Sequence, residues 1–392
     1  MSVALRSFDK IRWATLGLWL ALFGGVMVAV FLNLKTHTTM PTYQLASARW
    51  WQGIDPYTMD AHAGFLYFPQ AAVLFTPFHF MPVWGAEIFW RATTFGLYFY
   101  ALVRLGRFFL SEDGVFSAKT FLYLSLLAVW SSLASLRNAQ FDLPLAALVV
   151  LTSAEVAASR WTAAAIWICL AVALKPLAVV PLLLFTALYW KLIPRVIIGM
   201  AVVIALPFLH WSPSFVAHEY VRCFQTLVMA SKGDEPRYSD LAALLSLYGY
   251  APSPELKTVV RVIFAAVYLG IGWLAVRRLK GIESAWVVGA LSADYLMLFN
   301  PRTETCSFVF LGSFVASLAL FYAQQSGRRA AAWMLGVGAI CLACDAFPTI
   351  HHVSLHLLTD RWMKPLVAVV FFFMMLQFIF EKRPAPAQRS VA

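Results

Sequence analysis

The sequence predicts an all-α membrane protein, a polytopic bundle of about 12 spanning helices with interfacial or re-entrant helices in its first outer loop. Two observations predict this class. Of the 392 residues, 61% are hydrophobic and only 12% are charged, whereas a soluble domain carries about 25% charged residues. Mean hydropathy is +0.74. Because lipid offers backbone groups no hydrogen-bond partner, the chain must cross it as helices, and we expect residues 1–392 to form a single transmembrane domain.

A spanning helix needs about 20 apolar residues, and twelve runs in the chain reach or approach that length. They lie at residues 13–34, 84–106, 118–136, 141–158, 161–175, 177–192, 195–210, 258–276, 284–299, 305–324, 330–348 and 362–380. Pro176, Pro194 and Pro207 interrupt the pattern, because proline lacks the N–H group that a helix interior uses. The segment 65–82 is also apolar, but counting it as a span would reverse the side of every later loop. We therefore predict a re-entrant or interfacial helix there.

Basic residues at the ends of these runs predict the orientation. With residues 1–12 in the cytoplasm and alternating crossings, the basic loop residues fall on the cytoplasmic side, as is usual in membrane proteins, and both termini lie there too. These residues are Arg104, Arg107, Arg160, Lys191, Arg195, Arg277, Arg278, Arg328, Arg329, Lys382 and Arg383. The formal charge of +11 therefore reflects membrane orientation. No basic stripe with interleaved aromatic residues is present, so we expect no nucleic-acid partner.

This orientation places two long loops outside, at residues 35–83 and 211–257, with shorter ones near 137–140, 300–304 and 349–361. In the first loop, Tyr43, Ala46, Trp50 and Trp51 share one face of a helix, which is typical of a helix lying at the membrane interface with its Trp side chains at headgroup level. All eight histidines fall on or near the outer side. They are His37, His62, His79, His210, His218, His351, His352 and His356.

The sequence predicts no metal site and no cofactor. His351 and His352 suit a phosphate or a metal, but no third ligand follows at regular spacing. Cys341 and Cys344 have the spacing of a metal or redox pair, yet they lie in a hydrophobic run without a second pair. Packing is the favoured role for these cysteines.

Charged residues in apolar surroundings are the first candidates for chemistry. Lys175 lies between two apolar runs, where a cation is expensive and therefore a functional candidate. It either meets a phosphate, or extends its ammonium group to the interface, or pairs with an acid on another helix. Arg302 and Glu304 follow Pro301 at an outer helix junction. A guanidinium suits a phosphate and a carboxylate suits sugar hydroxyls or a proton, although the two side chains also suit each other.

Two further polar groups lie in the outer loops. One is a cluster of polar residues at an outer turn, made of Arg137, Asn138, Gln140 and Asp142. Its amides either bind sugar hydroxyls or cap the following helix. Asp55 and Asp60 are the acids of the first loop, where a carboxylate near a cation would serve as a base for glycosyl transfer. The alternative for Asp55 is an ordinary turn over residues 53–56.

Several short motifs carry a resemblance to a known family. They are W-W-x-G-x-D-P-Y from Trp50 to Tyr57, G-F-L-Y-F-P-Q from Gly64 to Gln70, R-N-A-Q-F from Arg137 to Phe141, A-L-K-P from Ala173 to Pro176, and N-P-R-T-E from Asn300 to Glu304. In this order they resemble the GT-C superfamily of bacterial polyprenyl-phosphate-sugar-dependent glycosyltransferases, in particular the mannosyltransferase-like glycosyltransferase family 87. The resemblance covers most of the chain.

The resemblance implies a helical bundle of the GT-C type in the bacterial inner membrane, with a cavity open to the periplasm. It implies inverting transfer of a sugar from polyprenyl phosphate to a lipid-linked or glycan acceptor of the cell envelope. Lys175, Arg302, Arg137, His351 and His352 are then the candidates for binding donor phosphate, and Tyr43, Tyr57, Asn138, Gln140 and Asp142 for binding sugar or acceptor.

One departure from the family concerns the base. The family's proposed base is an Asp a few residues before the tyrosine that matches Tyr43, but residues 38–43 contain no acid. Either Asp55, Asp60 or Glu304 takes the role, or the chain transfers differently or not at all. The alternatives from other classes are a lipid-carrier transporter or flippase and a non-catalytic subunit that binds sugar lipids.

Overall fold

The computed structural model describes residues 2–32, 38–57, 64–112, 114–231, 238–279, 281–343 and 361–381. Over these ranges the protein is helical throughout, with no β-strand and one isolated bridge between Glu112 and Val115. The predicted all-α class is confirmed. The helices are α1 (Ser2–Leu32), α2 (Met40–Gln52), α3 (Pro69–Leu74), α4 (Thr76–His79), α5 (Val83–Phe109), α6 (Ala118–Ala128), η1 (Trp130–Ser132), α7 (Leu133–Arg137), α8 (Asp142–Ala157), α9 (Trp161–Leu174), η2 (Pro176–Ala178), α10 (Val179–Leu188), η3 (Trp190–Leu192), α11 (Ile193–Ala205), η4 (Leu206–Leu209), α12 (Pro213–Ser231), α13 (Leu241–Ser246), α14 (Pro254–Arg278), α15 (Ile282–Phe299), η5 (Thr305–Phe308), α16 (Val309–Gln324), α17 (Arg329–Cys341) and α19 (Lys364–Phe380).

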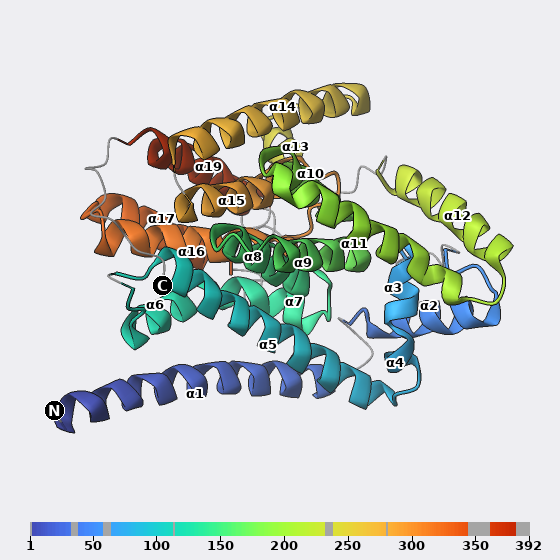
Figure 1. Cartoon of the computed structure of the whole chain (residues 1–392), viewed down its shortest axis with the longest axis horizontal. Coiled ribbons are helices and arrows are strands. Elements are labelled where there is room, and N and C mark those ends of the chain that lie inside the picture. The colour runs from blue at the N-terminus through green and yellow to red at the C-terminus, as the bar shows by residue number, and fades with distance from the viewer. Residues whose placement is uncertain are drawn as a thin grey trace.

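Three helices form the centre of the bundle. α8 is buried from Asp142 to Val156, and most of α15 and α16 is buried as well. The peripheral helices differ: only 22% of the apolar stretch of α1 and 17% of that of α14 are buried. Figure 1 shows these two helices along opposite edges of the bundle. Because their exposed faces are apolar, they are suited to contact lipid rather than water.

The central helices approach closely at small residues. The Cα of Gly289 in α15 lies against the Ser153 hydroxyl of α8, and a Cβ at that glycine would collide with the hydroxyl oxygen. Gly312 in α16 meets Ser131 of η1 in the same way. Contacts between small residues are the usual means of helix association in membranes, where burial from water does not drive packing.

Over the residues that the structure describes, each of the twelve predicted apolar runs consists mainly of one helix or of two or three consecutive helices. Six of the described helices are long and apolar enough to cross a membrane, or seven if α6 and the bent η1–α7 segment count as one span. α9, the η2–α10 pair and α17 are apolar but shorter. The count of about 12 spans therefore stays a prediction. Segment 65–82 contains α3 and α4, of six and four residues, and neither is long enough to cross.

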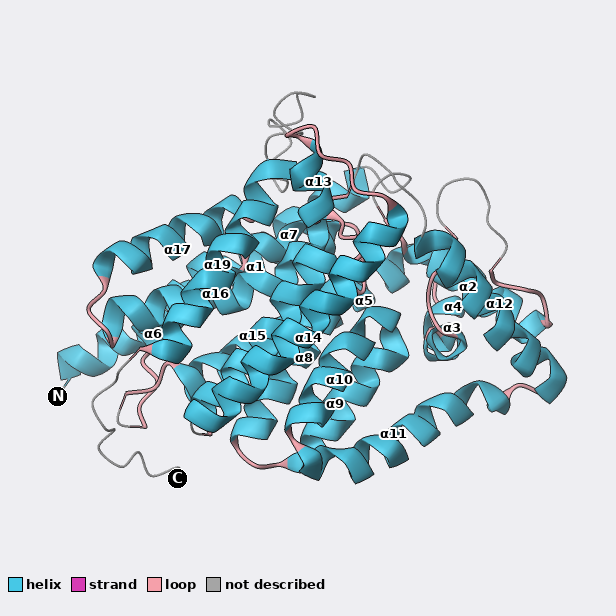
Figure 2. Ribbon diagram, turned by 90° about the horizontal axis from the view of Figure 1, so that it is seen from above, coloured by secondary structure: helices cyan, strands magenta, loops and turns pink. Residues whose placement is uncertain are grey.

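Helices α2, α3, α4 and α12 lie together at one end of the bundle, which we call the loop end (Figures 1 and 2). α2 begins after Thr39 with Pro41 in its first turn and is followed by Gly53, whose φ of 70° suits glycine. The predicted face of α2 exists, but the expectation that Trp50 lies at headgroup level is wrong. Trp50 is fully buried among protein side chains, because α12 and η4 cover that face.

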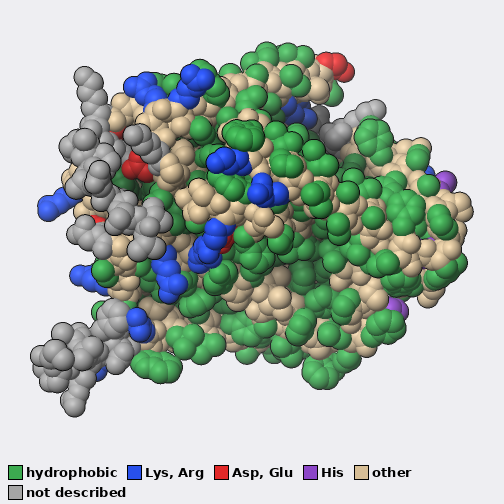
Figure 3. All heavy atoms as spheres, viewed as in Figure 1, with side chains coloured by type: hydrophobic (Ala, Val, Ile, Leu, Met, Phe, Trp, Pro, Cys, Tyr) green, Lys and Arg blue, Asp and Glu red, His purple; other side chains and the backbone are tan. Residues whose placement is uncertain are grey.

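Charge is unevenly distributed over the surface. On the face shown in Figure 3, most visible Lys and Arg side chains lie over the left half, and the visible His side chains lie at the right end. The right end in this view is the loop end. This separation agrees with the predicted bias of positive charge. The assignment of each end to a side of the membrane stays a prediction.

Candidate functional site

Lys175 and Asp142 form an ion pair where three helices end or begin. Pro176 terminates α9, so Lys175 leaves the helix in an extended conformation (φ −149°, ψ 133°). Its Nζ donates to Oδ1 of Asp142, the first residue of α8, at 2.7 Å. The Asp142 side chain is 1% exposed and that of Lys175 is 18% exposed. Of the three roles considered for Lys175, the structure shows pairing with an acid on another helix.

Glu304 and Gln140 join the turns that precede α8 and η5. The Nε2 of Gln140 donates to Oε2 of Glu304 at 2.9 Å, and the Cys306 sulfur lies 2.7 Å from Oε1 of Gln140. Glu304 is half-buried, whereas Cys306 is buried. Side chains from two motifs that are more than 160 residues apart in the chain are therefore in direct contact.

Tyrosines of the loop end lie beside these polar groups. The hydroxyl groups of Tyr43 and Tyr67 are 3.1 Å apart, and the Tyr57 hydroxyl donates to the Tyr67 carbonyl at 2.9 Å. The Tyr43 ring packs on Phe141, next to Asp142, with ring centres 4.6 Å apart. Burial raises the pKa of Tyr43 and Tyr67 well above the usual range, and the charges of Asp142 and Glu304 add to the rise at Tyr67. Both phenols are therefore neutral hydrogen-bonding groups.

We call Lys175, Asp142, Gln140, Glu304, Tyr43 and Tyr67 the junction cluster. Sequence reasoning singled out five of these residues and missed Tyr67, although it is part of the G-F-L-Y-F-P-Q motif.

Lys364 was also missed. It is a fully buried cation at the start of α19, and its Nζ donates to the Thr305 carbonyl, next to Glu304, at 3.0 Å. A lysine that opens an apolar run was the available signal.

Asp55 lies in a different set of contacts. Its Oδ1 accepts from the Tyr57 backbone N–H at 2.6 Å, so Asp55 does form a turn, although this turn spans residues 55–57 and not 53–56. Its Oδ2 accepts from Nε of Arg222 in α12 at 3.0 Å. Both carboxylate oxygens are therefore engaged: Oδ1 stabilises the first loop locally and Oδ2 holds it to α12. Beside them, the Glu219 carboxyl is 1% exposed. Burial and then the Asp55 carboxylate raise the pKa of Glu219 to about 7.

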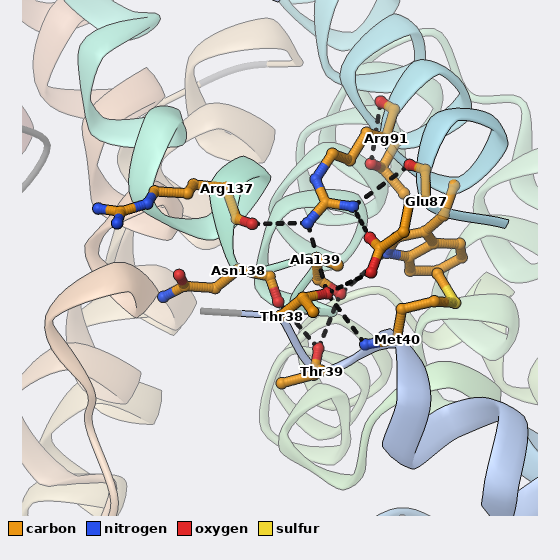
Figure 4. Close-up of polar contacts among 10 residues, drawn as sticks. Thr38, Thr39, Met40, Glu87, Arg91, Arg137, Asn138 and Ala139 are labelled. Atoms are coloured by element: carbon orange, nitrogen blue, oxygen red, sulfur yellow. Dashed lines mark hydrogen bonds and ion pairs between the residues drawn. The ribbon is translucent and has the colours of Figure 1, made fainter. Parts of the chain in front are cut away.

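The remaining candidates are spread more widely. The Arg302 guanidinium stacks over the Tyr238 ring, 5.5 Å from its centre. Arg137 and Asn138 contribute backbone carbonyls to local contacts, and Figure 4 shows both side chains directed away from the Glu87–Arg91 pair. Asp60, His351 and His352 lie outside the described residues. Within the described ranges, no group of three or more His, Cys, Asp or Glu side chains is arranged to hold a metal ion.

The junction cluster combines a cation suited to an anionic group with a half-buried carboxylate suited to accept a proton. Neutral phenols and an amide complete it with hydrogen-bonding groups that match hydroxyl-rich ligands. Along α8 the polarity stops abruptly, because residues 143–151 are all apolar. The polar side chains of this helix are thus confined to its Asp142 end and, at the opposite end, to residues 152–155.

Comparison with known proteins adds a family match. The sequence model of glycosyltransferase family 87 matches residues 65–301, which is more than half of the chain. A search of curated proteins finds no match. Among solved structures, the chain is similar to ArnT from Cupriavidus metallidurans in the apo state, with 16% identity, a TM-score of 0.43, and coverage of 92% of this chain and 75% of ArnT. It is also similar to ArnT from the same organism bound to undecaprenyl phosphate, with 15% identity, a TM-score of 0.37, and coverage of 92% and 76%.

Proposed function

The chain belongs to glycosyltransferase family 87, and from this premise we propose that it transfers a sugar from a polyprenyl-phosphate carrier to a lipid-linked or cell-envelope acceptor. We place the reaction at the periplasmic face of a bacterial inner membrane, with the loop end outward. The observation that carries the proposal is the junction cluster, which places a cation and a proton acceptor at the same helix junction at one end of the bundle.

Lys175 is the proposed binding group for donor phosphate. A lysine ammonium has three N–H donors, and one of them is directed at Asp142. Asp142 therefore holds the ammonium group in place and leaves its other donors for a phosphate oxygen. An anion beside Lys175 also gains from a low local dielectric, because the pair is largely shielded from solvent. Arg302 is a second candidate for this role.

Glu304 is the proposed base. In the transfer, an acceptor hydroxyl oxygen attacks the anomeric carbon of the sugar, and the bond from that carbon to the phosphate oxygen breaks. The phosphate leaves with the electron pair, and the hydroxyl proton passes to Glu304. Glu304 is half-buried and held by Gln140, whereas both oxygens of Asp55 are engaged with Tyr57 and Arg222. We therefore prefer Glu304 over Asp55.

A transporter or flippase would need polar groups along a path through the membrane and a site near its midplane. The apolar stretch 143–151 of central helix α8 argues against such a path. A non-catalytic binder of sugar lipids is the alternative that the missing first-loop acid favours, and it differs from the transferase only in turnover.

The test is transfer from radiolabelled polyprenyl-phosphate mannose, glucose or arabinose by membranes that contain the chain. We expect one donor to support transfer, Glu304→Gln to lower kcat by about 100-fold or more, and Lys175→Met to raise the KM for donor. The matched control is Glu155→Gln, at the opposite end of α8, which should leave both constants unchanged. Donor binding without turnover by the unsubstituted protein would establish the non-catalytic binder instead.

A further inference from the structure

α5 carries an ion pair that the proposed reaction does not use. Glu87 and Arg91 lie one helical turn apart, both are fully buried, and their side chains pair directly. Removing two charges from water is costly and is tolerated only when further hydrogen bonds satisfy the pair. The partners of these two side chains therefore indicate what the pair holds together.

The pair joins two segments that are distant in the sequence. The Thr38 hydroxyl donates to Oε1 of Glu87 at 2.8 Å, at the start of the first loop. On the other side, Nη2 of Arg91 donates to the Arg137 carbonyl at 2.6 Å. Figure 4 shows Glu87 and Arg91 side by side, with dashed lines that run to Thr38 and to the Arg137 carbonyl.

That turn contains a strained residue. Ala139 has a φ of 55°, in the left-handed region that residues with a Cβ disfavour. Hydrogen bonds to three successive carbonyls hold the turn in place. Arg91 donates to the carbonyl of Arg137, Thr39 donates to that of Asn138 through its backbone N–H and its hydroxyl, each at 3.0 Å, and the Trp90 indole donates to that of Ala139 at 2.9 Å. The Thr39 hydroxyl also reaches the Ala139 carbonyl at 3.1 Å.

The residues that follow the turn belong to the junction cluster. Gln140 comes directly after Ala139 and binds Glu304, and Asp142 follows two residues later and binds Lys175. We propose that Glu87, Arg91 and Thr39 are positioning residues: they fix the strained turn at Ala139 and thereby set the places of Gln140 and Asp142. The inference rests on the proposed function, since it concerns the geometry of the same site.

The same contacts bring a carboxylate to the segment that lacks the family's acid. Residues 38–43 contain no carboxylate of their own, but Glu87 supplies one to Thr38 from α5. Glu87 is not a base for transfer, because it is fully buried and bound by both Thr38 and Arg91. In this chain the start of the first loop anchors the backbone of the turn.

Activity gives the first test, with Thr39→Val, Thr39→Ser, Glu87→Gln and the control Glu155→Gln. Val removes the Thr39 hydroxyl at nearly constant shape, whereas Ser retains it. We expect Thr39→Val and Glu87→Gln to lower kcat by about 10- to 100-fold with little change in the KM for donor, because misplaced groups slow the chemical step. Thr39→Ser should recover most of the loss. Glu155 pairs with Arg104 at 2.9 Å at the other end of the bundle. Glu155→Gln should therefore lower the melting temperature and leave kcat and the KM for donor unchanged.

A second readout needs no turnover and uses Cys306, which is buried against Gln140. In a background where Cys169, Cys223, Cys341 and Cys344 are replaced by Ala, N-ethylmaleimide labelling of Cys306 reports loosening of the turn. We expect Thr39→Val to raise the labelling rate by at least about threefold, and Thr39→Ser and Glu155→Gln to leave it near the starting rate. Unchanged labelling and unchanged kcat in folded Thr39→Val and Glu87→Gln would overturn the inference. Altered labelling in a chain that transfers no sugar would instead overturn only the proposed function.

Discussion

The ammonium group of Lys175 is held by the carboxylate of Asp142. Removing that carboxylate alone should destabilise the protein more than removing both charged groups. Asp142→Asn leaves a largely buried cation without its partner, and breaking a buried pair in this way costs about 3–5 kcal/mol. We expect Asp142→Asn to lower the melting temperature in detergent more than the double variant Asp142→Asn/Lys175→Met does. A double variant as unstable as the sum of the two single ones would contradict a direct interaction.

Glu219 makes stability depend on pH near neutrality. Its pKa is raised to about 7 by burial and by Asp55, whereas the unfolded chain has the ordinary value for glutamate. The folded state therefore binds a proton that the unfolded state releases, and this contribution to stability is lost as pH rises through about 7. We expect the melting temperature to fall as pH rises from the ordinary glutamate pKa of 4.5 to about 7, and to level off above it.

Glu219→Gln should flatten this decline, since an amide does not titrate. The matched control is Glu255→Gln. Glu255 is an exposed residue in the first turn of α14. A slope that stays the same in Glu219→Gln would show that another group causes the pH dependence.

At the level of elements, the contact between α8 and α15 depends on the absence of a side chain at Gly289. A methyl group there would collide with the Ser153 hydroxyl, so we expect Gly289→Ala to destabilise the protein by about 1–3 kcal/mol. Adding Ser153→Ala should recover part of the loss in thermal unfolding. Gly336→Ala is the control, because nothing lies near the place that its Cβ would occupy. If Gly336→Ala destabilises the protein as much as Gly289→Ala does, the close contact between α8 and α15 is not the cause of the loss.

The helices were largely predictable from the sequence, and their side-chain pairings were not. An apolar run between polar ends requires a helix in lipid, which is why α1, α14, α15 and α16 lie where hydropathy predicted them. The pairing of Lys175 with Asp142 and of Gln140 with Glu304 depends on how separate helices pack against each other. Local sequence patterns do not show which helices are neighbours. The role of Trp50 was misjudged for the same reason, since the cover from α12 and η4 is a tertiary effect.

For the molecule as a whole, the separation of basic residues from the loop end predicts which end faces the cytoplasm. In a chain without its native cysteines, we introduce Glu112→Cys between α5 and α6, and Ala251→Cys before α14, both at exposed positions. A membrane-impermeant maleimide added to intact spheroplasts should label Ala251→Cys alone, and both positions after lysis. Labelling of Glu112→Cys in intact cells would reverse the orientation and place the junction cluster on the cytoplasmic side.

The fully buried pair on α5 also constrains how the sequence can change over time. Replacing Glu87 or Arg91 alone leaves a lone charge in the protein interior, whereas exchanging both for apolar residues of similar volume is often tolerated. A substitution at one of these positions therefore destabilises the protein unless the other position changes with it. Among relatives that share the Thr38–Thr39 segment, positions 87 and 91 are expected to covary, and an alignment deep enough to detect pairwise covariation provides the measurement.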